Sequence, residues 1–291
     1  MHSIKQIGER FWYMTPEFEN DRPVLGMVVG RNKTLMIDAG NSESHAQYFL
    51  NELRKREIAG PDFVALTHWH WDHIFGLSAL TDAVSIASKA TKKEMEKLLP
   101  YSWSDEALAA RVKEGTEIQF CADAIKKEYA SQRDIKIILP KMIFDYRLEI
   151  DLGGVTCLVQ QVGGSHASDS VVVYVKEEKI LFLGDCICAD IYAKNRNYKI
   201  DETLRLLDRL AAFDADTYVL SHGLPISKNE FEQEITMLRA IATLTDRLKG
   251  NIQHVMETYE KLVERELTED ELEVIHEFAM GYFFRSVAHS I

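Results

Sequence analysis

Three histidines and one aspartate lie within six residues of one another in the segment THWHWDH, residues 67–73. Imidazole nitrogens and carboxylate oxygens are ligands for zinc and similar divalent metals. The segment directly follows the short apolar run Phe63–Leu66, which predicts a buried strand. Because a loop at a strand end can turn alternating side chains towards one point, whereas a regular helix would spread them, this spacing predicts a metal site.

A site for two metals needs more ligands than this segment holds, and three candidates occur further along the chain. His166 follows the predicted strand at 156–162, Asp185 follows the run Leu181–Gly184, and His222 follows Val219–Ser221. Each of them, taken alone, could be a structural residue at a strand end. Taken together, they are what a metal site at one edge of a sheet requires, so we predict that they join the histidine-rich segment.

The elements that must position these residues alternate between short apolar strands and amphipathic helices. Apolar runs bounded by turn residues predict strands at residues 24–30, 34–38, 63–66, 135–138, 156–162, 171–175, 180–183 and 217–221. Apolar residues at spacings of three and four predict helices at 42–56 and 200–213. Thr268 and Glu271 fit a capping box that starts a further helix. Strands interleaved with helices predict an α/β fold.

The chain is expected to form one catalytic domain with helical additions. Residues 1–226 are assigned to this domain, and residues 227–291, whose pattern is helical throughout, to a C-terminal extension. Residues from about 88 to 134 are charged and helix-prone, and they predict a helical insertion within the domain. This insertion could overhang the site as a lid, although its sequence names no ligand.

The composition limits the classes of partner. The chain has 291 residues, and its 34 lysines and arginines against 46 aspartates and glutamates leave a net charge of −12. A surface this acidic repels the phosphate backbones of nucleic acids, so no nucleic-acid partner is expected. The sequence has no run of 18 apolar residues and no apolar segment typical of a secretory signal. We therefore expect a cytoplasmic protein with no membrane segment.

The order of the candidate residues resembles the five motifs of the metallo-β-lactamase superfamily. The resemblance extends from about residue 24 to about residue 224, and it implies a four-layer αββα sandwich with the metals at one edge. The resemblance implies that the first ion is bound by His68, His70 and His166. It implies that the second ion is bound by Asp72, His73 and His222. It implies that Asp185 is the bridging carboxylate and that Asp38, in the first motif, orders the metal loops without being a ligand.

The resemblance also implies the chemistry, which is hydrolysis by water that two divalent ions activate. Two such ions lower the pKa of a water held between them, and this gives hydroxide at neutral pH. Zinc is the expected metal, with Mn²⁺ or Fe²⁺ as alternatives, and Asp72 and Asp185 are the expected catalytic carboxylates. The expected substrate is a small ester, thioester, lactone or amide.

Two other activities within the superfamily stay open. Persulfide dioxygenases share these histidines but bind a single iron through two histidines and one aspartate, so the metal and its stoichiometry separate them from the hydrolases. Zinc β-lactamases with a cysteine ligand resemble the stretch from His166 to Cys186, and Cys186 falls at the position of their cysteine. They carry an arginine where this chain has His73, however, and a lysine where it has Ala189. We therefore expect Cys186 to be a packed thiol and not a ligand.

One basic cluster in this acidic chain bears on the substrate. Residues 194–199 read KNRNYK and follow Asp185, so Lys194 and Arg196 are candidates for binding a substrate carboxylate or phosphate. Tyr192 is a further candidate for contact with the substrate. The expected partner is a small molecule, and the apolar stripe of the last helix is compatible with a homodimer.

Overall fold

A computed structural model describes residues 2–130 and 133–288. The contacts within it divide the chain into two compact units. Unit 1 comprises Met1–Gln161, Asp169–Asp185 and Ala215–Ile226, and unit 2 comprises Val162–Ser168, Cys186–Asp214 and Ser227–Ile291. Parts of the predicted insertion and extension, residues 131–132 and 289–291, lie outside the described residues. The domain boundary that the sequence places at residue 226 stays a prediction.

The described part of unit 1 contains a sheet of seven strands that follow one another in chain order. They are β1 (Ile4–Ile7), β2 (Phe11–Met14), β3 (Leu25–Val29), β4 (Thr34–Ile37), β5 (Phe63–Ala65), β6 (Val84–Ser88) and β7 (Met142–Phe144). The first four strands pair antiparallel, and β4 to β7 pair parallel. Parallel pairing directs the carboxyl ends of β4 and β5 to the same edge of the sheet.

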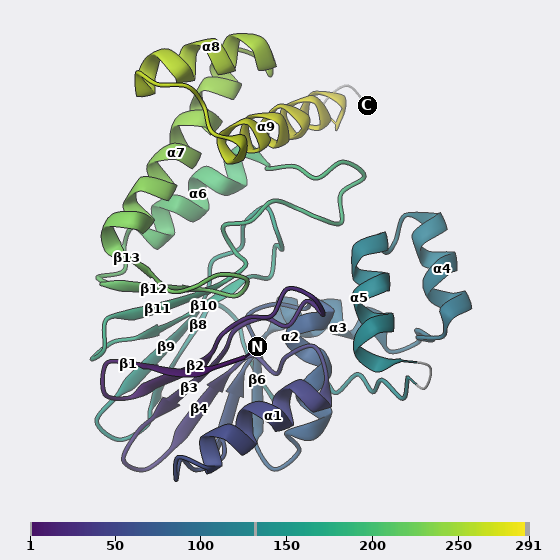
Figure 1. Ribbon diagram of the computed structural model, residues 1–291, viewed down its shortest axis with the longest axis vertical. Helices are drawn as coiled ribbons and strands as arrows, with labels where there is room; N and C mark the ends of the chain where they lie inside the picture. The colour runs from purple at the N-terminus through teal and green to yellow at the C-terminus, as the bar shows by residue number, and fades with distance from the viewer. Residues whose placement is uncertain (1, 131–132, 289–291) are drawn as a thin grey trace. The chain divides into compact units, whose positions relative to one another are not determined.

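A second sheet, as far as the chain is described, has six strands in the order β13-β12-β11-β10-β9-β8. They are β8 (Arg147–Asp151), β9 (Thr156–Gln161), β10 (Val171–Val175), β11 (Ile180–Gly184), β12 (Thr217–Leu220) and β13 (Ile226–Ser227). The strands from β8 to β11 pair antiparallel, whereas β11 and β12 pair parallel. Figure 1 shows the strands of the two sheets as neighbouring layers.

One hydrophobic core joins the two sheets of unit 1. Phe11 and Leu35 of the first sheet share this core with Val173, Phe182 and Val219 of the second sheet, and all five side chains are fully buried. Burial of side chains of this kind contributes about 1.5–3 kcal/mol each. A slip of one residue would expose them, so the core fixes the register of the strands and with it the places where the strands end.

The helices of unit 1 lie mainly beside the first sheet. Those in its described part are α1 (Glu43–Arg54), α2 (Trp71–Ile74), the 3₁₀ helix η1 (Phe75–Ala79), α3 (Lys89–Leu98), α4 (Asp105–Glu114) and α5 (Gln119–Tyr129). α1 contacts β1, and α3 contacts β6 and β7. Ser42, Ser88 and Ser104 each accept a backbone N–H of the helix that follows, so these serines determine where α1, α3 and α4 begin.

Unit 2 is mainly helical. It contains α6 (Ile200–Leu210), α7 (Lys228–Arg247), α8 (Ile252–Val263) and α9 (Glu269–Ala288). Leu207, Ile241 and Phe278 belong to a separate hydrophobic core that these helices share. The predicted capping box at the start of α9 is confirmed, because the N–H of Thr268 donates to the Glu271 carboxylate at 2.9 Å and the N–H of Glu271 donates to the Thr268 hydroxyl at 3.2 Å.

One predicted strand is wrong. The structure assigns residues 135–138 to no helix and no strand. The apolar run ends at Pro140, whose nitrogen carries no hydrogen for a sheet, and the place beside β6 is taken by β7, which begins after this proline. The sequence analysis also does not predict β1, β2, β6, β7, β8 and β13. Runs of two to five residues are too short to give a clear periodicity.

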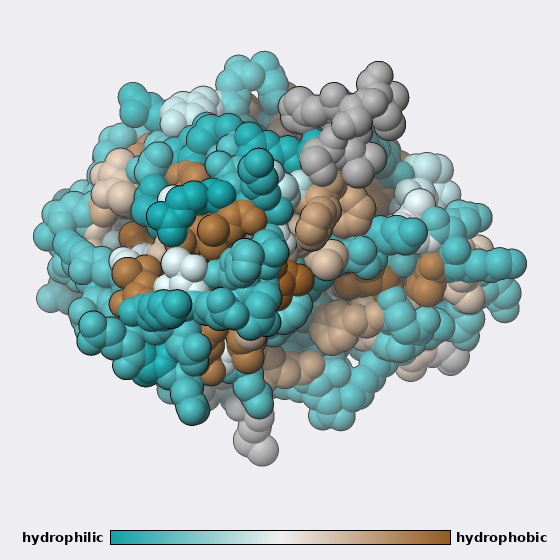
Figure 2. All heavy atoms as spheres, turned by 90° about the horizontal axis from the view of Figure 1, so that it is seen from above, coloured by the Kyte–Doolittle hydropathy of each residue, from teal (hydrophilic) through white to brown (hydrophobic). Residues whose placement is uncertain are grey.

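The surface of the chain is largely polar. Figure 2 shows one face on which hydrophilic residues predominate and hydrophobic residues form smaller groups. This distribution agrees with the net charge of −12. Across the residues that the structure describes, no helix has the length and the apolar composition that crossing a membrane requires.

Candidate metal centre

The ends of four strands bring the candidate ligands of unit 1 together. Asp38 follows β4, the segment 67–73 follows β5, Asp185 follows β11, and His222 comes shortly after β12. β4 pairs parallel with β5, and β11 pairs parallel with β12, so each pair ends at one edge of its sheet. Because the two sheets share one core, these two edges place the candidate residues close to one another.

Four side chains with little exposure form the centre of the site. The ligating atoms of Asp72, His73, Asp185 and His222 all lie within 4.8 Å of one another. Nε2 of His73 is 3.0 Å from Oδ2 of Asp72 and 3.2 Å from Oδ2 of Asp185. Nε2 of His222 is 3.1 Å and 3.4 Å from the same two oxygens. Two imidazole nitrogens and two carboxylate oxygens therefore face one point, which is an arrangement that suits a divalent cation.

Asp38 orders the segment after β5, which carries Asp72 and His73 in the short helix α2. Its buried carboxylate accepts the N–H of Thr67 at 2.7 Å and the hydroxyl of Thr67 at 2.8 Å. It also accepts Nδ1–H of His73 at 2.8 Å, so that Nε2 of His73 faces the other ligands. Asp38 has a φ of +60°, which is a strained conformation for a residue other than glycine. The loop thus depends on one carboxylate that holds both Thr67 and His73.

His68 and His70 lie on the same loop and belong to a second potential metal-binding group. Their ring centroids are 4.5 Å apart, and both side chains are buried. The hydroxyl of Thr67 donates to Asp38 and therefore accepts Nδ1–H of His68, at 3.1 Å. This leaves Nε2 of His68 to face Asp185, whose Oδ2 is 3.9 Å away. Asp185 thus lies between the two groups, at a position that suits a bridging carboxylate.

His166 belongs to unit 2, in which its imidazole ring contacts Ala189. Its Nδ1 lies 3.0 Å from the carbonyl oxygen of Ala189, to which the ring donates Nδ1–H. This hydrogen bond selects the neutral tautomer whose Nε2 carries the lone pair that a metal ion needs. The place of His166 in the first metal site stays a prediction.

A glycine at the end of β11 lets Asp185 reach the metal loop. Gly184 has a φ of +60°, a conformation that favours glycine, and the pairing of β11 with β12 shifts its register at this point. A Cβ atom at residue 184 would lie 3.0 Å from Cβ of Thr67. The irregular end of the strand therefore brings the backbone against the loop and presents the next side chain, Asp185, to it.

The charges within the central group stabilise one another. Burial alone would raise the pKa of Asp72 and Asp185, but the facing imidazoles of His73 and His222 outweigh it and hold both pKa values below their usual range. Burial would likewise lower the pKa of the two histidines, but the facing carboxylates raise it well above the usual value. The group thus attracts cations, and a divalent metal would displace the imidazole protons. The donor set fits a metal on these grounds.

Two carboxyl groups near the site, one partly exposed and one buried, are not predicted from the sequence. Oδ1 of Asp21 lies 3.5 Å from Nδ1 of His222. Burial and the neighbouring charge of Asp72 raise the pKa of Asp21 to about 7. Asp169 is fully buried. Asp21 is an isolated acid in a turn and gives no signal in the sequence, whereas Asp169 lies in the stretch HASDS, residues 166–170, that the motif order singles out.

The carboxyl group of Asp169 is expected to make the stability of the chain depend on pH. Burial raises its pKa from the ordinary value of 3.8 to about 7. Since the folded chain holds this proton more tightly than the unfolded chain, the resulting stabilisation is complete below about pH 4 and is lost as the pH rises to about 7. Asp169→Asn cannot ionise and should remove this loss.

Urea unfolding of both metal-free proteins between about pH 5 and pH 8 measures this effect. The free energy of unfolding of Asp169→Asn, relative to that of the wild type, is expected to increase with pH by up to a few kcal/mol. The histidines of the candidate metal centre are the same in both proteins, so their own titration cancels in the difference. Curves that run parallel across this range would contradict the prediction.

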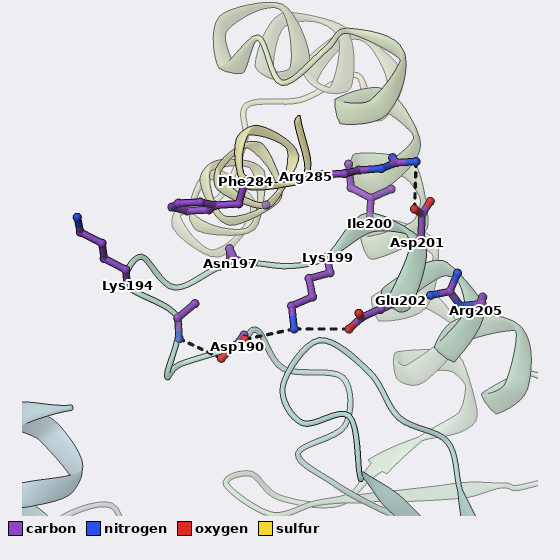
Figure 3. A pocket seen from close by; sticks show the side chains of 12 residues that line it. Asp190, Lys194, Asn197, Lys199, Ile200, Asp201, Glu202, Arg205, Phe284 and Arg285 are labelled. Carbon is purple, nitrogen blue, oxygen red and sulfur yellow. Dashed lines mark hydrogen bonds and ion pairs between the residues drawn. The ribbon is translucent and has the colours of Figure 1, made fainter. Parts of the chain in front are cut away.

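A cavity in unit 2 bears on the predicted substrate contacts. It has a volume of about 550 Å³, and Lys194 lines it together with Asp190, Lys199, Glu202 and Phe284, among others. Figure 3 shows Lys199 between two acids, with its Nζ 3.4 Å from Asp190 and 3.7 Å from Glu202, whereas Lys194 stands apart from these paired side chains. Lys194 therefore lines the cavity with no ion pair drawn to the acidic side chains shown there.

The other two candidates for substrate contact have different neighbours. Nε of Arg196 lies 2.6 Å from Oε1 of Glu277, and its Nη1 lies 3.2 Å from Glu273, so this arginine tethers its loop to α9. The backbone N–H of Tyr192 donates to Asp190 at 3.1 Å. Of the three predicted substrate contacts, all of them within the described residues, Lys194 is the one that lines the cavity.

Comparison with known proteins identifies the family of this chain. A family model described as the metallo-beta-lactamase superfamily matches residues 21–222. This span extends from Asp21 to His222 and contains the candidate ligands of both metal sites. The chain therefore belongs to the metallo-β-lactamase superfamily, and the family predicted from the order of the motifs is confirmed.

One curated relative is a linear primary-alkylsulfatase from Pseudomonas sp. The chain is 23% identical to it over 241 residues, an alignment that covers 76% of this chain and 46% of that protein. The chain thus spans about half the length of the curated relative that it matches. Together with the family match, this relative supports the prediction that the chain is an enzyme of the superfamily.

Solved structures show the same fold. A metallo-β-lactamase from Pontibacter korlensis is 18% identical with a TM-score of 0.57, and the match covers 81% of this chain and 98% of that chain. A stereoselective inverting sec-alkylsulfatase from Pseudomonas sp. is 13% identical with a TM-score of 0.66, and the match covers 96% of this chain and 47% of that chain. These likenesses confirm the predicted α/β sandwich fold with helices at the C-terminus.

Proposed function

We propose that the chain is a dinuclear metal-dependent hydrolase that acts on a small ester, thioester, lactone or amide. The observation that carries this proposal is the set of four facing donor atoms in unit 1. Two of these donors, from Asp72 and His73, belong to the same segment, residues 67–73, as the further imidazoles of His68 and His70. Zinc is the proposed metal, because nitrogen and oxygen donors of this kind suit it. We assign His166 as the third ligand of the first ion, because its Nδ1 is held by Ala189 and the family resemblance places it there.

The side chains of the site have different proposed roles in such a hydrolysis. Two divalent ions held at these donors would supply a water of lowered pKa and would polarise the substrate oxygen. Asp185 is the proposed bridge, because its Oδ2 faces imidazoles of both groups. The pKa of Asp72 is lowered, so this carboxylate is a weak base, and we assign it the role of a ligand that orients the water. Asp38 holds the loop and takes no part in the transfer of protons.

Elemental mass spectrometry of protein purified without a metal-affinity tag tests this proposal. About two zinc or manganese ions per chain are expected. About one iron per chain would overturn it and would favour a mononuclear iron oxidoreductase of the persulfide-dioxygenase type. Oxygen consumption with persulfides would then be the next assay.

Hydrolysis of sulfate esters is a second candidate function. It is favoured by the similarity to a linear primary-alkylsulfatase and to a sec-alkylsulfatase. A panel of alkyl sulfates, thioesters, lactones, β-lactams and small phosphodiesters separates the candidates. Zinc β-lactamase activity is the weakest of them, because this chain has His73 and Ala189 where those enzymes have arginine and lysine.

We also propose that Lys194 binds an acidic group of the substrate. Lys194→Ala is then expected to raise KM about twofold to fivefold with kcat nearly unchanged, since one exposed charge contributes about 1 kcal/mol or less. Steady-state kinetics on the best substrate of the panel measure this change. Lys261→Ala, which removes an exposed lysine from α8, is the matched control. A KM equal to that of the wild type would refute the assignment.

A further inference from the structure

The turn between Glu17 and Arg22 brings Asp21 to the Nδ1 side of His222. Glu17 and Arg22 pair as an isolated antiparallel bridge with two N–H···O bonds of 2.9 Å. Asp21 closes this turn with a φ of +54°, a conformation that aspartate tolerates better than most residues other than glycine. Its side chain is 14% exposed, and its Oδ1 lies 3.5 Å from Nδ1 of His222. The opposite nitrogen of His222 faces the ligand group.

Helix α5, within the predicted insertion, holds this turn in place. The side chain of Glu128 is 1% exposed, and it accepts Nε–H of Arg22 at 3.0 Å and Nη2–H at 2.7 Å. The hydroxyl of Tyr129 donates to the carbonyl oxygen of Asn41 at 3.0 Å. Nδ2 of Asn41 in turn donates to the carbonyl oxygen of Asp21 at 3.5 Å and to that of the residue before it at 2.8 Å. Two hydrogen-bonded paths therefore join α5 to the turn, in addition to the exposed ion pair between Lys127 of α5 and Glu19.

We propose that Asp21 is a positioning residue for the second metal site: it accepts Nδ1–H of His222 and thereby holds Nε2 of His222 towards the ligand group. Asp38 has the same relation to His73, whose Nδ1 it holds at 2.8 Å. α5 supplies no ligand to this group and instead stabilises the turn that carries the Asp21 carboxylate. The inference rests on the dinuclear site of the proposed function.

A carboxylate behind a ligating imidazole acts on the ligand in two ways. It selects the tautomer and the orientation of the ring, and its negative charge makes the opposite nitrogen a better donor. Loss of such a partner weakens metal affinity by about 10- to 100-fold. Because the carboxylate of Asp21 faces His222, the loss is expected at the ion that His222 binds and not at the first ion.

Two variants separate the carboxylate from the shape of the turn. Asp21→Asn keeps the size of the side chain and tolerates the positive φ, so it removes only the charge. Asp21→Gly removes the side chain and also relieves the backbone strain. Glu19→Gln is the matched control, because Glu19 lies in the same turn but is 74% exposed and pairs with Lys127. Metal-free proteins are titrated with Zn²⁺ against a chelating dye, and their melting temperatures are recorded without metal.

We expect the Asp21 variants to lose affinity for the second zinc ion and not for the first. Both Asp21 variants should bind the second zinc ion about 10- to 100-fold more weakly and the first within about twofold of the wild type. Their melting temperatures without metal should not fall, and Glu19→Gln should behave as the wild type. An unchanged second binding step, or an equal loss in both steps, would overturn the proposal.

The titration also separates this inference from the proposed function. Wild-type protein that binds only one ion would refute the dinuclear site and the role of Asp21 together. Wild-type protein that binds two ions, with an unchanged second step in Asp21→Asn, would refute the role of Asp21 alone. Glu128→Gln tests the part assigned to α5: a smaller loss in the second step is expected, and no loss would refute that part.

Discussion

Replacing His70 with alanine is expected to abolish hydrolysis and to lower the metal content while the chain stays folded. The imidazole of His70 is 3% exposed and lies against the rings of His68 and Trp69, at centroid distances of 4.5 Å and 4.7 Å. Without it the first ion loses one proposed ligand, so kcat/KM should fall by roughly three orders of magnitude, or about 4 kcal/mol in activation free energy. The free energy of unfolding of the metal-free protein should fall by only about 1 kcal/mol.

Three measurements check this prediction: steady-state hydrolysis, elemental mass spectrometry and urea unfolding of the metal-free protein. His254→Ala is the control, because His254 is an exposed histidine on α8, and it should match the wild type in all three. Full activity in His70→Ala would show that the assignment of His70 as a ligand is wrong. Unfolding of the variant would show that His70 supports the fold and not only the metal.

Asp38→Ala is expected to lower the free energy of unfolding strongly, whereas His70→Ala lowers it only slightly. The change leaves the N–H and hydroxyl of Thr67 and Nδ1–H of His73 without their buried acceptor. Each unpaired buried group costs about 1–3 kcal/mol. The left-handed backbone adds little to this difference, because aspartate also has a Cβ and is already strained in the wild type. The cavity relaxes in part, so the free energy of unfolding should fall by about 3–5 kcal/mol. The second ion should be lost as well, since His73 is no longer oriented.

Urea unfolding of the metal-free proteins measures the loss, and a zinc titration measures the effect on the site. Asp216→Ala is the control: its carboxylate is 62% exposed, and its removal should change the free energy of unfolding by about 0.5 kcal/mol or less. A stable Asp38→Ala variant that binds two ions would contradict the role of Asp38 in ordering the loop.

The strands that end at the site were predictable from the sequence. The predicted runs at 34–38, 63–66, 180–183 and 217–221 coincide closely with β4, β5, β11 and β12. These strands are buried on both faces, so their sequences are continuously apolar and are bounded by turn residues. The run at 135–138 has similar composition, but it has no place in the sheet, since β7 occupies the position beside β6. Composition alone does not tell which of two neighbouring apolar runs finds a partner strand.

The sequence did not predict two carboxyl groups near the candidate ligands, those of Asp21 and Asp169. Asp21 is one acidic residue among 46, and nothing near it in the sequence marks it. Its relation to His222 arises because the turn that carries it is held by Arg22 and Glu128, the latter from α5. The fully buried position of Asp169 likewise depends on contacts with distant segments.

By itself, the sequence determined the family, the candidate metal ligands and their order along the chain. These properties depend on residue type and spacing alone. The candidate ligands come after strands, and the apolar pattern of each strand predicts it. Only the tertiary structure decided which nitrogen of each imidazole faces the ligand group, and that Asp38 and Asp21 stand behind His73 and His222. Only it showed that α5 acts through a turn and supplies no ligand to the central group. The physical reason is that hydrogen bonds and ion pairs depend on distances of a few ångströms between segments far apart in the chain, and packing of the core sets those distances.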